Sequence, residues 1–200
     1  MIQEKLQTKR IPEEIDMREQ VMIMLAEGFE EVEAITITDL LRRAEIPAKT
    51  VSVTGDRLVK GAHGIPVGAD LLFDEVDFDL VRMILLPGGM PGTTNLLAYD
   101  PLTKILKRFA EEERPLGAIC AAPMVLAAHG ILSGKNATIY EGMESELMDA
   151  VPTEGEVVRD GNLFTSKGPG TAMEFALQLI GFLCGEEKRE EVKAGLLYRR

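Results

Sequence analysis

Short apolar runs that stop at glycine or proline, alternating with helix-patterned segments, most constrain how this chain can fold. VMIML at residues 21–25 ends shortly before Gly28, and LVRMILL at residues 80–86 ends at PGGMPG, residues 87–92. Runs this short and this continuously apolar are typical of strands buried on both faces of a parallel sheet. Residues 31–44 lie between such runs and carry apolar residues at helical spacing. The pattern predicts a doubly wound α/β sandwich, with a mostly parallel sheet and helices on both faces.

The remaining elements follow from the same reasoning. We expect further strands at residues 48–54, 115–119 and 136–139, hairpins at 58–67 and 157–166 (the second turning at Asp160 and Gly161), and helices at 101–113, 121–130, 143–150, 171–184 and from Glu186. The ligand site of such a sheet lies beyond the carboxyl ends of its strands. Three loops, residues 27–31, 87–92 and 119–121, should therefore meet there.

Length and charge limit the functions to consider. With 200 residues, 46% of them hydrophobic, the chain can bury one sizeable core, so we expect one domain over residues 20–200 and a charged arm at residues 1–19. A net charge of −11 repels phosphate backbones, which argues against nucleic acid as a partner. The N-terminus lacks the apolar stretch of a signal peptide, and no run of about 18 apolar residues follows. We therefore expect no membrane association and a cytoplasmic location.

Cys120 is the residue whose position most suggests chemistry. AICAAP, residues 118–123, takes the chain from a buried strand into a helix through this one residue, as at the nucleophile elbow of hydrolases. The helix N-terminus would favour an anionic sulfur and lower the thiol pKa. A free cysteine is also commonly a small buried hydrophobe, and the local pattern leaves both interpretations open. With Cys184 as the only other cysteine and no CxxC or HExxH spacing, the chain indicates neither a disulfide framework nor a metal site.

Carboxyl groups and backbone amides could assist such a thiol. Glu30, Glu31 and Glu33 crowd the start of the first helix, where they could simply be solvated. One of them near Cys120 would instead be pushed to stay protonated and would donate a hydrogen bond to the sulfur. The glycine-rich loop and the amide of Ala121 could supply N–H groups to an oxyanion, although a plain turn would have the same sequence.

Histidine and cofactor motifs add little. His129 lies nine positions beyond Cys120 on the same helix, about 13 Å along its axis, so it cannot be the base. His63 falls in the expected hairpin, where a solvent-facing position is favoured. SKGPGT at residues 166–171 opens a helix and is better explained by capping than by anion binding. GxGxxG and GK[ST] are both missing, so we expect no cofactor.

Several ordered motifs resemble the ThiJ/PfpI superfamily and, within it, the DJ-one/ThiJ branch. They are LAEGFEEVEA, LLRRAE, LLPGGMPG, AICAAP, SKGPGTAMEFAL and EVKAGL, and together they cover nearly the whole chain after Glu19. The resemblance implies a flavodoxin-like fold, a homodimer and an easily oxidised cysteine at a nucleophile elbow beside a protonated glutamate. It puts the cysteine at Cys120, its carboxyl partner at Glu33 and the oxyanion-hole amides at Gly89 and Ala121.

The resemblance also carries one further match and two departures. Arg43 matches an arginine near the dimer-facing site, where it would be auxiliary. The PfpI peptidases have histidine directly after the cysteine, and Ala121 in that place argues against a peptidase. The DJ-one branch often has a histidine where this chain reads ATIYEG, residues 137–142. Tyr140 stands at that position as a substitute auxiliary group.

These residues lead to one main functional hypothesis and two alternatives. The main one is a cofactor-independent enzyme of the glyoxalase-III or deglycase type, acting on a small reactive aldehyde or a glycated substrate. Cys120 would attack the carbonyl, the amides of Gly89 and Ala121 would hold its oxygen, and Glu33 would carry the proton. The first alternative is a dimeric redox sensor or chaperone that works by oxidation of Cys120. The second is an intracellular cysteine peptidase.

Overall fold

A computed structural model describes residues 20–199, so the predicted arm at residues 1–19 lies outside the described part of the chain. The strands are β1 (Gln20–Leu25), β2 (Ala48–Ser52), β3 (Leu58–Lys60), β4 (Pro66–Gly68), β5 (Leu71–Leu72), β6 (Val81–Leu86), β7 (Leu116–Ile119), β8 (Asn136–Ala137), β9 (Val151–Pro152), β10 (Val157–Asp160) and β11 (Leu163–Ser166). The α-helices are α1 (Glu31–Arg43), α2 (Gly92–Leu97), α3 (Asp100–Glu111), α4 (Pro123–Ala128), α5 (Ala172–Cys184) and α6 (Glu186–Gly195). The 3₁₀-helices are η2 (Phe73–Glu75), η3 (Phe78–Leu80), η4 (Glu144–Leu147) and η5 (Pro169–Thr171).

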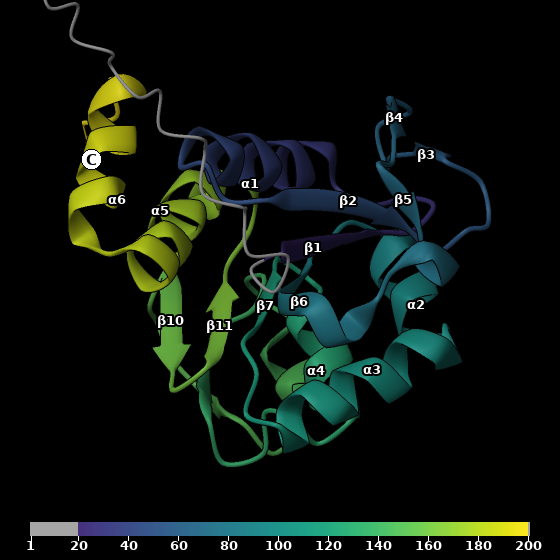
Figure 1. Cartoon of the computed structure of the whole chain (residues 1–200). Helices are drawn as coiled ribbons and strands as arrows, with labels where there is room; N and C mark the ends of the chain where they lie inside the picture. Colours follow the sequence, from purple (N-terminus) through teal and green to yellow (C-terminus); the bar gives the residue numbers. More distant parts are fainter. Residues whose placement is uncertain (1–19, 200) are drawn as a thin grey trace, which may run out of the picture.

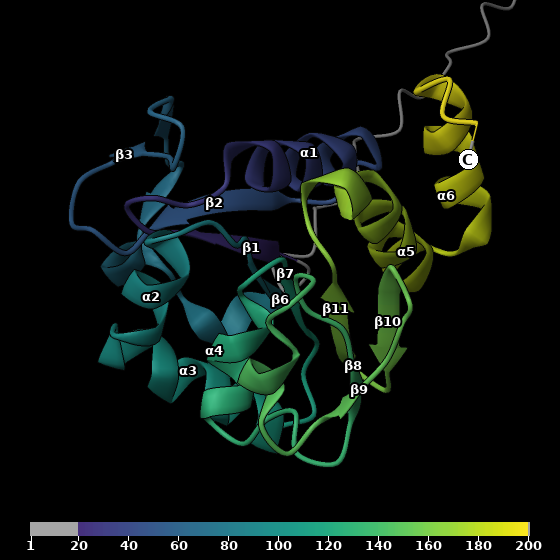
Figure 2. The same cartoon turned by 180° about the vertical axis from the view of Figure 1, so that it is seen from behind.

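A seven-stranded sheet runs through the middle of the molecule in the order β10-β11-β7-β6-β1-β2-β5 (Figures 1 and 2). Every neighbouring pair in it is parallel except β10 with β11. The β3–β4 hairpin and the short parallel pair β8–β9 stand outside this sheet. The predicted mostly parallel α/β sandwich is therefore confirmed.

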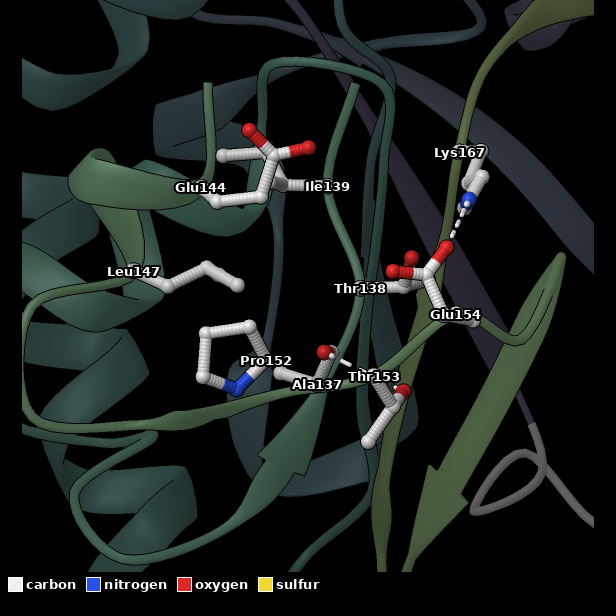
Figure 3. Close-up of a pocket in the computed structure, with 9 residues that line it drawn as sticks. All are labelled: Ala137, Thr138, Ile139, Glu144, Leu147, Pro152, Thr153, Glu154 and Lys167. Atoms are coloured by element: carbon white, nitrogen blue, oxygen red, sulfur yellow. Dashed lines mark hydrogen bonds and ion pairs between the residues drawn. The ribbon is translucent and has the colours of Figure 1, made fainter. Parts of the chain in front are cut away.

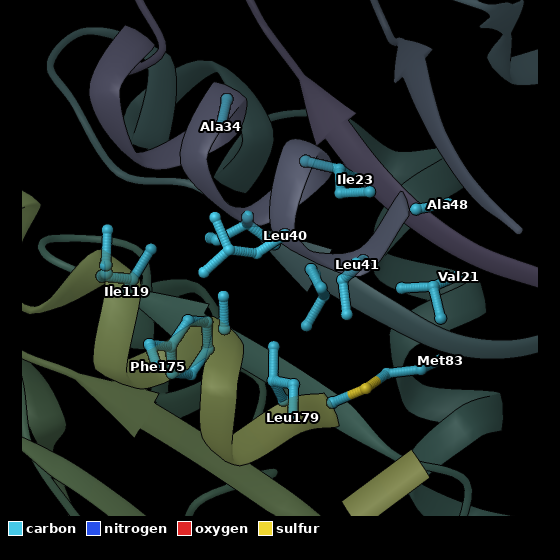
Figure 4. Close-up of a cluster of buried hydrophobic side chains, with 14 of the residues drawn as sticks. Val21, Ile23, Ala34, Leu40, Leu41, Ala48, Met83, Ile119, Phe175 and Leu179 are labelled. Carbon is cyan, nitrogen blue, oxygen red and sulfur yellow. The ribbon is translucent and has the colours of Figure 1, made fainter. Parts of the chain in front are cut away.

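Helices cover both faces of the sheet because its central strands are apolar on both sides. Alternate residues of β1 point in opposite directions. Val21 and Ile23 pack in one core with residues of α1 and α5, including Leu41 and Phe175 (Figure 4). Met22 and Met24 belong to the other core, which contains residues of α3 and α4. The longest α-helices have 13 residues, and within residues 20–199 none combines the length and apolarity needed to cross a bilayer.

Several local features differ from the sequence-based expectations. The predicted strand at residues 136–139 is only the two-residue β8, and the predicted helix at residues 143–150 is only the 3₁₀-helix η4. The second hairpin turns at Gly161 and Asn162, since Asp160 still pairs with Leu163. Helix α2 was not expected, because six residues are too few for a helical period to be visible.

Candidate active site

The three predicted loops do meet beyond the carboxyl ends of β1, β6 and β7, and they meet at Gly88. The Glu30 N–H donates to the Gly88 carbonyl oxygen at 2.9 Å, and the Gly88 N–H donates to Glu33 Oε2 at 2.7 Å. A Cβ atom added at Gly88 would lie 2.6 Å from the Cβ of Cys120. Only glycine therefore lets the loop after β6 lie between α1 and the cysteine.

Cys120 occupies a sharp turn between β7 and α4. Its φ of +63° lies in the left-handed region, which residues other than glycine rarely adopt. Its own N–H donates to the Ser166 carbonyl oxygen at 2.9 Å, and its carbonyl oxygen accepts the Tyr140 N–H at 2.9 Å. Both backbone groups are thus held, which keeps the strained turn in place. The predicted passage from strand to helix through this one residue is present, and the residue is only 9% exposed.

Glu33 is fully buried beside the thiol. While Oε2 accepts the Gly88 N–H, no described residue donates to Oε1 with good hydrogen-bond geometry. The Cys120 thiol lies within hydrogen-bonding reach of the carboxyl group. Burial raises the pKa of Glu33 to about 7, and the nearby Glu30 charge acts in the same direction, against the hydrogen bonds from Gly88 and Cys120. Near neutral pH this carboxyl is therefore divided between its two protonation states.

The thiol pKa is shifted in the direction opposite to the sequence-based prediction. Burial raises the pKa of Cys120 to about 12, and repulsion from the Glu33 carboxylate adds to the rise. The expected lowering by the helix N-terminus is wrong, because α4 begins only at Pro123, is six residues long and does not offset burial and a neighbouring carboxylate. A proton on Glu33 removes the repulsion, so the charges of the two groups depend on each other.

Two backbone amides point at the sulfur. The N–H groups of Gly89 and Ala121 lie close enough to the Cys120 thiol to favour its anionic form, and they act to lower its pKa. Gly89 has a φ of +86°, and a Cβ atom there would lie 2.5 Å from the Glu30 nitrogen. Glycine is thus required for the loop to present this amide. An oxyanion forming on a carbon bonded to the sulfur would lie next to the same two donors.

The two auxiliary residues suggested by the resemblance differ in position. Tyr140 is next to the cysteine through its backbone, while its ring is exposed and packs against Gly168. Arg43 lies ten residues after Glu33 on α1, about 15 Å along the helix axis. It forms an ion pair with Asp39 at 2.6 Å, so within one chain it does not belong to the Cys120 site.

The sequence did not predict the partners of His63. The β3–β4 hairpin brings its Nδ1 to 2.9 Å from Glu31 Oε2 and 3.2 Å from Glu30 Oε2. Burial acts to raise the pKa of Glu31, but hydrogen bonds, foremost from the His63 side chain, lower it to about 2. The hairpin can come so close because position 61 is glycine, where a Cβ atom would lie 2.3 Å from the Glu31 side chain. No spacing in the sequence indicates this contact.

The pocket drawn in Figure 3 is not part of this site. It is a cavity of about 50 Å³ between β8, η4 and the segment after β9, with Lys167 and Glu154 paired at 3.6 Å on its wall. A space of this size holds a few water molecules at most. A larger cavity of about 350 Å³, lined by Arg114 and Asn162, lies at the amino ends of β7 and β11. Ligand sites in such sheets lie at the opposite edge.

The raised pKa of Glu33 predicts a pH-dependent stability difference. Its folded-state pKa of about 7 exceeds the ordinary value of 4.5, so the native state binds more protons than the unfolded chain between these values. The free energy of unfolding of the wild type should therefore fall as pH rises through this window. Glu33→Gln does not titrate and should gain about 3 kcal/mol relative to wild type between pH 4.5 and pH 8. Urea unfolding at both pH values measures the gain. The exposed Glu111→Gln variant should show none, and an equal gap at both pH values would contradict the assignment.

The reactivity of Cys120 should depend on the same charge. In a Cys184→Ser background, Glu33→Gln should move the pH midpoint of Cys120 alkylation by iodoacetamide downward, on the order of one pH unit, because it removes a carboxylate that repels the thiolate. The exposed Asp39→Asn on α1 is the matched control. A midpoint that stays the same or rises in the Gln variant would mean that Glu33 carries no charge when the thiol ionises.

Comparison with known proteins identifies relatives of this chain. The DJ-1/PfpI family model matches residues 19–181. Protein dj-1beta of Drosophila melanogaster is 41% identical over 184 residues, which cover 90% of this chain and 98% of that protein. Protein DJ-1 homolog B of Arabidopsis thaliana is 39% identical over 170 residues, but the chain spans only 39% of its length.

A named enzyme and a solved structure complete the comparison. A deglycase of Pyrococcus abyssi is 30% identical over 165 residues, 82% of this chain and 98% of that protein. The structure of oxidized DJ-1 from Toxoplasma gondii has a TM-score of 0.87 at 36% identity, covering 90% of this chain and 99% of the other. The expected resemblance and its flavodoxin-like fold are confirmed. The chain therefore belongs to the DJ-1/PfpI family.

Proposed function

We propose that this protein is a cysteine-dependent enzyme that needs no cofactor and acts on reactive carbonyl compounds. One observation carries the proposal: the Cys120 sulfur lies between a carboxyl that titrates near neutral pH and two backbone N–H donors. A nucleophile, a proton carrier and an oxyanion-stabilising pair are what addition to an aldehyde requires. The similarity to a deglycase supports the same class of substrate.

Methylglyoxal serves as the model substrate for the reaction. The Glu33 carboxylate takes the thiol proton while the Cys120 sulfur bonds to the aldehyde carbon, and the former carbonyl oxygen receives hydrogen bonds from Gly89 and Ala121. A thiol with a high pKa can react in this way, because its proton leaves as the carbon–sulfur bond forms and no free thiolate is needed beforehand. Transfer of the C1 hydrogen to C2, with the proton held by Glu33 delivered to the C2 oxygen, then gives a lactoyl thioester and regenerates the Glu33 carboxylate. Water hydrolyses the thioester, releasing lactate and the thiol, so the sum is methylglyoxal plus water giving lactate.

The weak point of the site is the second proton carrier. Tyr140 stands where the branch often has histidine, and a phenol is a poorer proton carrier near neutral pH than an imidazole. A poorly assisted proton transfer typically slows a reaction by about 10²–10⁴-fold. We therefore expect slow turnover from the wild-type protein. An imidazole at this position would titrate close to the working pH.

Turnover of methylglyoxal tests the proposal. Wild type should form lactate without glutathione, metal or nucleotide, Cys120→Ser should form none, and Tyr140→His should be faster by about 10-fold or more. Cys184→Ser is the matched control and should keep the wild-type rate, because Cys184 is exposed at the end of α5. Lactate, measured enzymatically over many turnovers, is the readout. No lactate above the Cys120→Ser control, under conditions where peroxide still oxidises Cys120, would favour the redox-sensor function instead.

We further propose that the protein is a homodimer that pairs through α1 and the β3–β4 hairpin. Val32 and Ile35 are 54% and 45% exposed although both are apolar and follow each other on one side of α1. Ile65 of the adjoining hairpin is exposed as well, and its N–H reaches Glu31 at 3.3 Å. An exposed apolar patch made by neighbouring elements is typical of a protein–protein interface.

A single charge in this patch should break the dimer. Ile35→Glu is expected to shift the protein to the mass of one chain in size-exclusion chromatography with light scattering, because a buried unpaired carboxylate is costly at an interface. Val151→Glu, at an exposed apolar residue of β9, should leave the mass at two chains. A wild type that elutes as one chain, or a dimer that survives Ile35→Glu, would rule out this surface.

A further inference from the structure

Three potential metal ligands converge where the β3–β4 hairpin reaches the start of α1. They are a carboxylate oxygen of Glu30, a carboxylate oxygen of Glu31 and a ring nitrogen of His63, and each lies within 4.8 Å of the others. His63 Nδ1 is 2.9 Å from Glu31 Oε2 and 3.2 Å from Glu30 Oε2. Ligand atoms bound to one ion through bonds of about 2.1 Å lie roughly 3 to 3.5 Å apart. The two distances from His63 Nδ1 are therefore close to those within a coordination shell.

Each carboxylate has one oxygen fixed by the backbone and the other turned to the histidine. Glu31 Oε1 accepts the N–H groups of His63 at 2.8 Å and Ile65 at 3.3 Å, and Glu30 Oε1 accepts the Val32 N–H at 3.3 Å. Backbone contacts of this kind orient the ligands of known metal sites. The arrangement does not need an ion to bring the carboxylates together.

Glu30 Oε2 shares its nearest donor, His63 Nδ1, with Glu31 Oε2. Glu30 is only 5% exposed, and no described residue gives Oε2 a hydrogen bond of good geometry. Its contact with His63 Nδ1 at 3.2 Å is shared with Glu31 Oε2, which lies nearer to the same nitrogen at 2.9 Å. One divalent ion would satisfy both carboxylate oxygens and the ring nitrogen together.

We propose that Glu30, Glu31 and His63 bind a divalent transition-metal ion of the Zn²⁺ class. Two carboxylate oxygens and one imidazole nitrogen suit Zn²⁺, whereas Mg²⁺ and Ca²⁺ prefer oxygen alone. In a single chain the side chain of His63 is 72% exposed, which leaves room for water to complete the coordination. Because Ile65 of the same hairpin belongs to the proposed dimer surface, the ion would lie beside the interface between two copies. The site joins the hairpin to α1 and does not depend on the reaction proposed for Cys120.

Zinc titration of the full-length protein, without a histidine tag, tests the proposal. Isothermal titration calorimetry of metal-free protein should give one Zn²⁺ per chain. His63→Ala and Glu30→Gln should each weaken binding by more than the roughly 10- to 100-fold lost with an outer-shell partner. His129→Ala is the matched control, because its ring contacts Thr103 elsewhere, and it should bind like wild type. Cys120→Ser should also bind like wild type.

Hydrogen exchange locates the ion independently of affinity. Zn²⁺ should slow exchange at the amides of His63 and Ile65, which donate to Glu31, in wild type and in Cys120→Ser but not in His63→Ala. Three results would each overturn the proposal: no zinc bound by wild type, unchanged affinity in His63→Ala, or loss of zinc in Cys120→Ser. The last result would put the ion on the thiol.

Discussion

The close approach of three loops at Gly88 holds the candidate site together. The Gly88 N–H fixes one oxygen of Glu33, its carbonyl oxygen holds the Glu30 amide, and its missing side chain leaves room for Cys120. Without this contact the carboxyl would be neither buried nor beside the sulfur. The unusual protonation of the site is thus a consequence of backbone packing, since it is burial that raises both pKa values.

When a carboxyl and a thiol are buried side by side, they favour one proton shared between them over a permanently ionised thiolate. The two amide donors from Gly89 and Ala121 act against burial but do not overcome it while Glu33 is charged. In the proposed mechanism the anionic sulfur forms only as the substrate is attacked. The same arrangement would limit reaction with other electrophiles when no substrate is bound.

Much of the fold was predictable from single residues and short patterns. Continuous apolar runs such as β1 are typical of strands buried on both faces, and the proline and glycines after β6 favour a sharp loop. Prediction failed where the pattern was too short or irregular, as in α2 and η4. The structure brings Cys120, Glu33 and the loop of Gly89 together, and their catalytic roles stay a prediction. The sequence-based pKa of the thiol was wrong because helix position was considered without the burial that competes with it.

The sequence by itself determined the order of strands and helices and placed the cysteine at a strand-to-helix turn, because both follow from the polarity and backbone freedom of neighbouring residues. The family motifs added the pairing of Cys120 with Glu33. Tertiary structure alone decided which charges face each other across loops. Glu31 and His63 are 32 positions apart and meet only because the hairpin folds back at a glycine onto the start of α1. Contacts of that kind depend on long-range packing, which no local pattern encodes.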